Sequence, residues 1–221
     1  ALRLLGMGHG MIEALPVDEN GRITVDGLRD ALAASKDPAI VVLQAGELNT
    51  GGFDRFRDLA PIARAAGAWV HVDGAFGLWA RVSPQHAPLA DGVELCDSWA
   101  TDGHKYLNVP YDSGFAIVRD AQALVAAMSM STSYLPVIGE TRSPVDWNPE
   151  FSRRARGFPV YAAIRELGRE GIAALVARTC AHASRLVEGL GELRGVTVLA
   201  RPVLNQGLVC FPSPKAGASD E

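Results

Sequence analysis

The sequence predicts an α/β protein built on a mostly parallel sheet. Residues 39–44 form a short apolar run of β-branched character, typical of a buried parallel strand, and further strand candidates lie at 69–73, 97–101 and 114–118. Segments with apolar residues at helical spacing alternate with these runs, at 25–32 and 53–66. The alternation favours parallel strands joined by right-handed crossovers. In such folds, functional sites lie at the carboxyl ends of the strands.

The helix expected at 53–66 has sequence signals at both ends. Asp54 is a candidate N-terminal cap, and Gly67 is a typical residue after the end of a helix. Pro61 is unfavourable inside a helix, so we expect it to start the main helical run after a looser first turn.

The pattern changes after about residue 150. Long helices are expected at 152–168 and 172–190, and the runs at 196–199 and 207–211 predict a pair of strands. The polar tail that follows, from 212 to 221, is expected to be disordered.

These patterns predict two domains, both partial. Residues 1–150 are expected to form a large domain, and residues 151–221 the start of a smaller C-terminal α+β domain. Residues 1–6 resemble the last turns of a helix that ends at a glycine, which indicates that the chain begins inside a domain.

The overall composition is that of an ordinary globular protein. The 221 residues are 48% hydrophobic and 21% charged, with a formal net charge of −4. No basic run points to nucleic acid, and the apolar stretches are far shorter than the roughly 20 residues of a membrane span. The three cysteines form no CxxC pair, which argues against a disulfide framework or structural zinc and favours a reducing, cytoplasmic compartment.

The residues with chemical potential follow two of the predicted strands. Asp73 ends one strand, and Lys105 lies in a turn after a later one. This pair suits pyridoxal 5'-phosphate (PLP), because a lysine can bind its aldehyde and a carboxylate can keep its pyridine nitrogen protonated. Gly74 and Ala75 are small enough for a flat ring to lie against the backbone. Each residue alone is unremarkable, but together they predict a PLP site.

The motifs also resemble a known family, the group II PLP-dependent amino-acid decarboxylases. This family includes the aromatic-amino-acid and glutamate decarboxylases, and its fold is that of aspartate aminotransferase. The similarity extends from about Ile40 to Leu190, with motifs at 51–54, 71–76, 97–98, 104–107, 133–135 and 152–155.

The resemblance assigns cofactor-binding roles to several residues. Lys105 matches the lysine that carries PLP as a Schiff base, and Asp73 matches the partner of the pyridine nitrogen. Ala75 matches the small residue packed against the ring. Asp102 lies where relatives often place a polar group on the phosphate side.

The resemblance also assigns residues to the reaction. His104 matches the residue before the lysine, which contacts the phosphate or the reacting substrate. Tyr134 matches the tyrosine of a mobile catalytic loop, which is thought to help protonate the substrate α-carbon after carbon dioxide leaves. Arg153 or Arg154 is a candidate partner for a carboxylate.

The sequence departs from the family in two places. Relatives often carry a threonine pair after the glycine that corresponds to Gly46, where this chain has Glu47 and Leu48, so Asn49 or Thr50 is left as a candidate for the hydroxyl contact. Relatives also have a long preceding segment that supplies phosphate-binding residues and a histidine stacked on the ring. That segment is not in this sequence.

Three hypotheses about function follow. The first is a decarboxylase of aromatic or acidic L-amino acids, for which the resemblance implies a homodimer. The second is another PLP enzyme of the same fold, such as an aldolase, a carbon–sulfur lyase or an aminotransferase. The third is an inactive fragment of such an enzyme. Two weaker patterns are a glycine-rich loop at 6–10 and a possible metal site formed by His71, Asp73 and His104.

Overall fold

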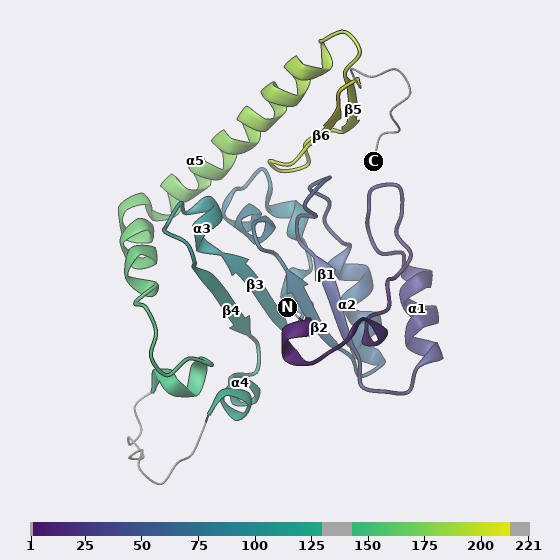
Figure 1. The fold of residues 1–221 in the computed structure, drawn as a ribbon, viewed down its shortest axis with the longest axis vertical. Coiled ribbons are helices and arrows are strands. Elements are labelled where there is room, and N and C mark those ends of the chain that lie inside the picture. Colours follow the sequence, from purple (N-terminus) through teal and green to yellow (C-terminus); the bar gives the residue numbers. More distant parts are fainter. Residues whose placement is uncertain (1, 130–142, 213–221) are drawn as a thin grey trace.

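A four-stranded sheet forms the centre of the computed structural model, which describes residues 2–129 and 143–212 (Figure 1). Its strands lie in the order of the sequence: β1 (Ile40–Gln44), β2 (Trp69–Asp73), β3 (Ser98–Asp102) and β4 (Gly114–Val118). The first three strands are parallel, and β4 runs antiparallel to β3. The prediction of an α/β fold with a mostly parallel sheet is therefore confirmed.

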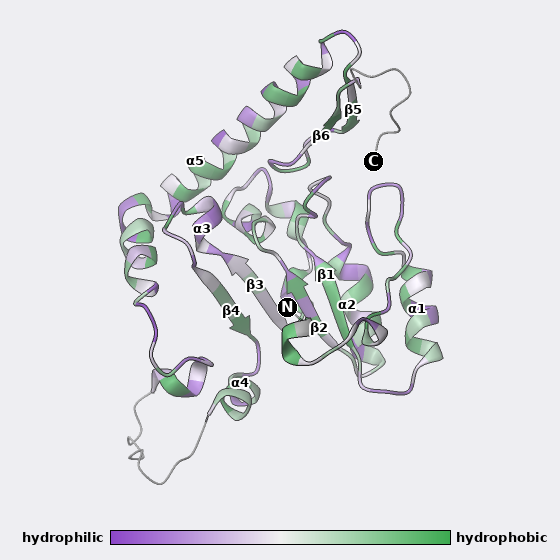
Figure 2. Ribbon diagram, viewed as in Figure 1, coloured by the Kyte–Doolittle hydropathy of each residue, from purple (hydrophilic) through white to green (hydrophobic). Residues whose placement is uncertain are grey.

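Helix α2 (Phe56–Ala65) packs against this sheet, and α1 (Val25–Ala34) packs against α2. Both helices share a hydrophobic cluster with the strands, in which Phe56, Val70 and Val72 are fully buried. Strand β1 is hydrophobic along most of its length (Figure 2), but its side chains alternate in burial, with Ile40 60% exposed and Leu43 fully buried. Burial of a large apolar side chain contributes about 1.5–3 kcal/mol, so the buried face of the sheet anchors the fold.

The expected N-terminal cap of α2 is wrong. The helix begins at Phe56, and the Asp54 carboxylate instead accepts hydrogen bonds from the backbone N–H groups of Ile23 (2.8 Å) and Gln44 (2.7 Å). It thereby ties the segment before α1 to strand β1. Burial raises the pKa of the Asp54 carboxyl group, although these two hydrogen bonds oppose the rise.

The expected place of Pro61 is also wrong, because it lies in the interior of α2 and not at its start. Pro61 is on the exposed side of the helix. The carbonyl that loses its hydrogen bond can therefore be hydrated there, which lowers the cost of an internal proline.

The C-terminal part of the chain consists of a long broken helix and a strand pair. Helix α5 (Gly157–Gly191) is interrupted at Gly168, whose φ of 60° and ψ of −177° are not helical. Strands β5 (Thr197–Ala200) and β6 (Leu208–Cys210) pair antiparallel beside the end of α5, as predicted (Figure 1). The first half of α5 starts at 157 instead of 152, and in the segment ahead of it Arg154 and Arg156 contact the loop at residues 111–112.

The remaining elements are short. Helix α3 (Gly103–Tyr106) directly follows β3, and helix α4 (Ala121–Met128) follows β4. Tyr106 joins α3 to α5, since it packs in one buried cluster with Val176 and Cys180. Single 3-10 turns occupy 2–5, 9–11, 77–82, 87–90, 93–95 and 144–147.

Two of the sequence expectations concern the first and last residues of the chain. The first residues form a 3-10 turn, Leu2–Leu5, followed by Gly6 with a positive φ of 83°. The tail expected to be disordered lies outside the described residues, apart from Pro212. Across the described part of the chain, none of the helices combines the length and the apolar character that crossing a membrane would require.

Candidate active site

Lys105 lies on the one-turn helix α3, immediately after strand β3. Its Nζ is 3.1 Å from Oδ2 of Asp102, and the same oxygen is 3.5 Å from Nε2 of His104. The Lys105 side chain is 37% exposed, whereas His104 is 12% exposed. The amine is therefore paired with a carboxylate and still accessible to a ligand.

Asp73 lies at the same edge of the sheet, at the carboxyl end of β2. It pairs in register with Ala100 of β3, two residues before that strand ends at Asp102. The Asp73 carboxylate accepts a hydrogen bond from the backbone N–H of Ala75 at 3.2 Å. Because β2 and β3 are parallel and adjacent, the two strand ends place Asp73 and Lys105 on one edge.

Backbone contacts fasten the segments that follow these two strands. The N–H of Asp102 donates to the carbonyl oxygen of Ala75 at 2.9 Å, and the indole N–H of Trp79 donates to the carbonyl oxygen of Asp102 at 3.1 Å. Ala75 and Asp102 are thus held directly against each other.

The turn after β2 also packs tightly against the end of β1. A Cβ on Gly77 would lie 2.0 Å from the carbonyl oxygen of Ala45, so only glycine fits at this position. This packing fixes Phe76, whose ring centroid lies 5.9 Å from Nζ of Lys105. An aromatic ring at that distance attracts a cation weakly.

His104 is held by two residues of the loop between α3 and β4, neither of which was predicted. Its ring stacks on Tyr111 with the centroids 4.1 Å apart and the planes at 32°. Its Nδ1 lies 3.0 Å from the backbone nitrogen of Ser113 and 2.9 Å from the carbonyl oxygen of Ser113. No periodicity or motif indicated this loop, and its closeness to Lys105 in the sequence was the only available signal.

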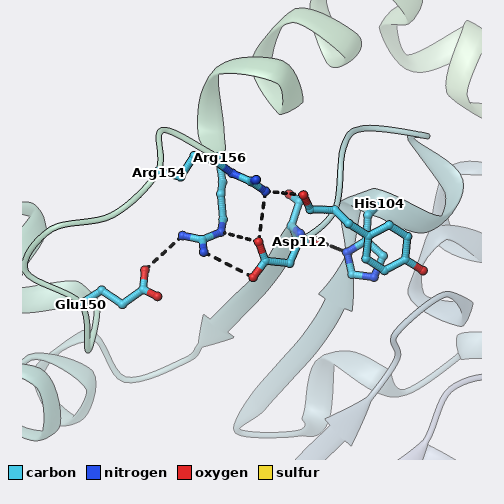
Figure 3. A network of polar contacts seen from close by, with 7 residues as sticks. His104, Asp112, Glu150, Arg154 and Arg156 are labelled. Atoms are coloured by element: carbon cyan, nitrogen blue, oxygen red, sulfur yellow. Dashed lines mark hydrogen bonds and ion pairs between the residues drawn. The ribbon is translucent and has the colours of Figure 1, made fainter.

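The residue between these two, Asp112, faces a group of arginines (Figure 3). Its carboxylate binds Arg154 and Arg156 at 3.1 Å each. The contact of Arg154 is thus a salt bridge with an exposed carboxylate of the protein, and a role for Arg153 or Arg154 toward another carboxylate stays a prediction. Arg153 has a hydrogen bond to the carbonyl oxygen of Glu150. The hydrogen bond from Arg156 lowers the pKa of the Asp112 carboxyl group.

His71 forms a hydrogen bond within the sheet. Its Nδ1 lies 2.8 Å from the hydroxyl of Ser98, which also accepts a hydrogen bond from the indole N–H of Trp69 at 2.7 Å. Burial lowers the pKa of His71, and the nearby charge of Asp73 only partly opposes this. In the described segments, no three His, Cys, Asp or Glu side chains are grouped so that they could hold a metal ion.

The loop after β1 uses its polar groups internally. The Glu47 carboxylate accepts hydrogen bonds from the backbone N–H groups of Asn49 and Thr50 and from the Thr50 hydroxyl at 3.0 Å. The same hydroxyl accepts from the N–H of Gly52 at 3.2 Å. Thr50 is therefore occupied in holding the turn, as is the side-chain amide of Asn49, which also donates to Glu47.

This edge of the sheet fits PLP at the aldehyde and ring ends of the cofactor. An accessible amine, a carboxylate one strand away and a small side chain at Ala75 are the groups that these ends require. Of the residues predicted from the sequence, the structure gathers Asp73, Ala75, Asp102, His104 and Lys105 here. Tyr134 lies outside the described residues.

A β-sheet edge with this donor set is typical of PLP-dependent enzymes, and comparison with known proteins gives the family. Residues 3–213 match the model of the pyridoxal-dependent decarboxylase conserved domain. The chain therefore belongs to the family of PLP-dependent decarboxylases, which confirms the resemblance drawn from the motifs.

Individual relatives agree with this assignment. The chain is 28% identical to an aromatic-L-amino-acid decarboxylase of Drosophila lebanonensis over 93% of its length and 52% of the relative's. It is 27% identical to an L-2,4-diaminobutyrate decarboxylase of Rhizobium meliloti (strain 1021), over 96% of its length and 44% of the relative's. The chain thus spans about half the length of these curated relatives.

The fold is likewise that of solved decarboxylase structures, over part of their chains. The crystal structure of Oryza sativa TDC with PLP and tryptamine superimposes with a TM-score of 0.85 at 24% identity. The match covers 92% of this chain and 44% of that one.

Proposed function

We propose that this chain provides the lysine-bearing part of a PLP-dependent decarboxylase of L-amino acids. The observation that carries the proposal is the placement of Asp73 and Lys105 at the ends of adjacent parallel strands, with the Lys105 amine accessible. Family membership supports the same reaction class. When bound, PLP supplies the electron sink that decarboxylation needs.

The roles proposed for the cofactor-binding residues follow from their chemistry. Lys105 would hold PLP covalently, Asp73 would keep a proton on the ring nitrogen, and Ala75 would leave space for the ring. Asp102 carries the same charge as a phosphate, and its 3.1 Å contact with Lys105 favours a role beside the lysine amine. His104, one residue away, would face the phosphate or the substrate.

Tyr134 is proposed to return a proton to the substrate α-carbon after carbon dioxide leaves. This role comes from the motif around residues 133–135. A phenol at this position would favour an amine as the product.

The substrate is proposed only as a class, aromatic or acidic L-amino acids and their close analogues. The relatives named above act, by their names, on aromatic amino acids and on L-2,4-diaminobutyrate.

We also propose a homodimer, supported by exposed apolar side chains such as Ile40 and Val42. A cytoplasmic location is proposed as well, supported by three free cysteines. The division into domains at about residue 150 is likewise proposed.

The decisive experiment adds PLP to the chain, reduces the product with borohydride and maps the modified peptide by mass spectrometry. We expect label on Lys105 and none in Lys105→Ala, with Lys36 as an internal control for non-specific labelling. Carbon dioxide release is then measured with aromatic and acidic amino acids, and Asp73→Ala should lower it strongly.

The other outcomes separate the alternatives. Release of ammonia, or transfer of the amino group, would favour a different PLP enzyme of this fold. Specific labelling of Lys105 without turnover would indicate that this chain holds the cofactor but needs further parts of the site. Labelling no stronger at Lys105 than at Lys36 would overturn the proposal.

A further inference from the structure

Three consecutive residues in the loop between α3 and β4 contact two different parts of the protein, His104 and the segment ahead of α5. Tyr111 stacks on the His104 ring, and the backbone of Ser113 faces Nδ1 of the same ring. Between them, the side chain of Asp112 points away toward the segment ahead of α5 (Figure 3). The position of Asp112 therefore affects both residues that hold His104.

Two arginines fix Asp112 from the other side. Arg156 contacts both carboxylate oxygens, with Nε 3.1 Å from Oδ1 and Nη2 3.3 Å from Oδ2. Arg154 contacts Oδ1 at 3.1 Å and also donates a hydrogen bond to the carbonyl oxygen of Tyr111. Glu150 completes the network, at 3.1 Å from Nη1 of Arg156. The loop is thus held through a side chain and through its backbone.

The orientation of His104 matters because its other nitrogen faces the candidate site. Nε2 is 3.5 Å from the Asp102 oxygen that binds Lys105. Ser113 presents both its N–H and its carbonyl oxygen to Nδ1, so it fixes the plane of the ring in either tautomer. A shift of the loop would turn Nε2 away from Asp102.

We propose that Asp112, Arg154 and Arg156 are positioning residues for His104. Acting through Tyr111 and Ser113, they hold its ring with Nε2 directed at Asp102 and Lys105. A role of this arrangement in catalysis rests on the proposed function. The contacts that orient His104 do not depend on that function. It also links the segment ahead of α5 to the site at the sheet edge.

The exposure of the Asp112 side chain sets how large an effect its removal should have. The Asp112 side chain is 70% exposed, and a single ion pair at such a position contributes little. Here one carboxylate binds two guanidinium groups, one of them through both oxygens, and such geometry is stronger and more directional. We therefore expect Asp112→Ala to slow covalent capture of PLP roughly two- to tenfold, without unfolding the chain.

The direct test observes His104 in the PLP-free chain. With histidine labelled by 13C and 15N, the His104 signal is identified by its loss in His104→Gln. In Asp112→Ala we expect this signal to lose the ring-current shift caused by Tyr111, and Asp112→Glu should restore part of it. Asp91→Ala is the matched control, because Asp91 is also an exposed carboxylate paired with an arginine, Arg57, with contacts to both oxygens.

Each result decides the proposal. An unchanged His104 signal in a folded Asp112→Ala variant would overturn it, and so would an equal change in Asp91→Ala. If Asp112→Ala does not fold, the double variant Arg154→Gln/Arg156→Gln removes the same contacts from the other side and is judged by the same signal. Because this measurement needs no PLP, failure of the wild-type chain to capture PLP would count against the proposed function alone.

Discussion

At the scale of single residues, the contact between Lys105 and Asp102 is the feature that most directly bears on cofactor capture. The Asp102 carboxylate lies 3.1 Å from Nζ of Lys105, so the amine must leave this contact before it can attack the aldehyde of PLP. Both side chains are partly exposed, so solvent weakens the pair.

Removal of this carboxylate gives the first prediction. Asp102→Asn should accelerate covalent capture of PLP roughly two- to fivefold, because the Lys105 side chain no longer has to leave a charged partner before it reaches the aldehyde. Stopped-flow absorbance of PLP measures the rate. Asp26→Asn, at an exposed i,i+3 pair with Arg29, is the control and should leave the rate unchanged. A slower rate in Asp102→Asn would show that the carboxylate assists capture.

His71 gives a prediction about pH. Burial lowers its folded-state pKa, so His71 contributes stability above its unfolded pKa of about 6.5, and this contribution is lost as the pH falls through the lower folded value. His86, whose pKa burial also lowers, adds to the same trend. The free energy of unfolding should therefore decrease between pH 7 and pH 5.

The variant His71→Asn separates the contribution of His71 to this pH dependence from that of the other titrating groups. An asparagine can still form a hydrogen bond with Ser98, as donor or as acceptor, but does not titrate, so the decrease in unfolding free energy should become smaller. Urea unfolding at pH 5, 6 and 7 measures this. The exposed His9→Asn should keep the wild-type slope, and an unchanged slope in His71→Asn would contradict the assignment.

At the scale of elements, the break in α5 depends on one glycine. Gly168 has φ 60° and ψ −177°, a region that side chains strongly disfavour. Gly168→Ala should destabilise the chain by about 1–3 kcal/mol, or force α5 into a different path. Thermal unfolding followed by circular dichroism measures the change.

The same helix offers a matched control. Gly189 is helical, and neither it nor Gly168 has an atom within 4 Å of an added Cβ, so crowding does not distinguish the two positions. Gly189→Ala should stabilise the chain by about 0.5–1 kcal/mol, because alanine favours helix. If both variants shifted the melting temperature in the same direction, the strain at Gly168 would not be the cause of the break.

At the scale of the whole molecule, PLP binding should appear as increased stability. The candidate site joins the ends of two adjacent central strands, so a ligand held there favours the folded chain. Saturation at about 100 times the Kd would raise the free energy of unfolding by about 2.7 kcal/mol. Differential scanning calorimetry with and without PLP measures the effect. Lys105→Ala should lose most of the increase, and the same increase in this variant would locate PLP elsewhere.

The sequence alone determined the fold class and the central residues of the candidate site. Apolar runs of strand length indicated where the strands lie, although β1 is buried on one face only, with Ile40 and Val42 exposed on the other. The predicted strands then placed Asp73 at the end of one strand and Lys105 just after another, where the structure has them. Motif resemblance supplied the family, which the match over residues 3–213 confirmed. The roles of the site residues, Tyr134 included, stay predictions.

Only the tertiary structure decided the contacts made between distant segments. Asp54 looked like a helix cap but binds N–H groups 31 and 10 residues away, and Arg154 and Arg156 cross more than 40 residues to hold Asp112. Local patterns report periodicity and turn preference, whereas a charged side chain pairs with whatever the packed chain brings within reach. The surroundings of Lys105, from Asp102 to the loop that holds His104, therefore became visible only once the strands were paired and the helices were packed.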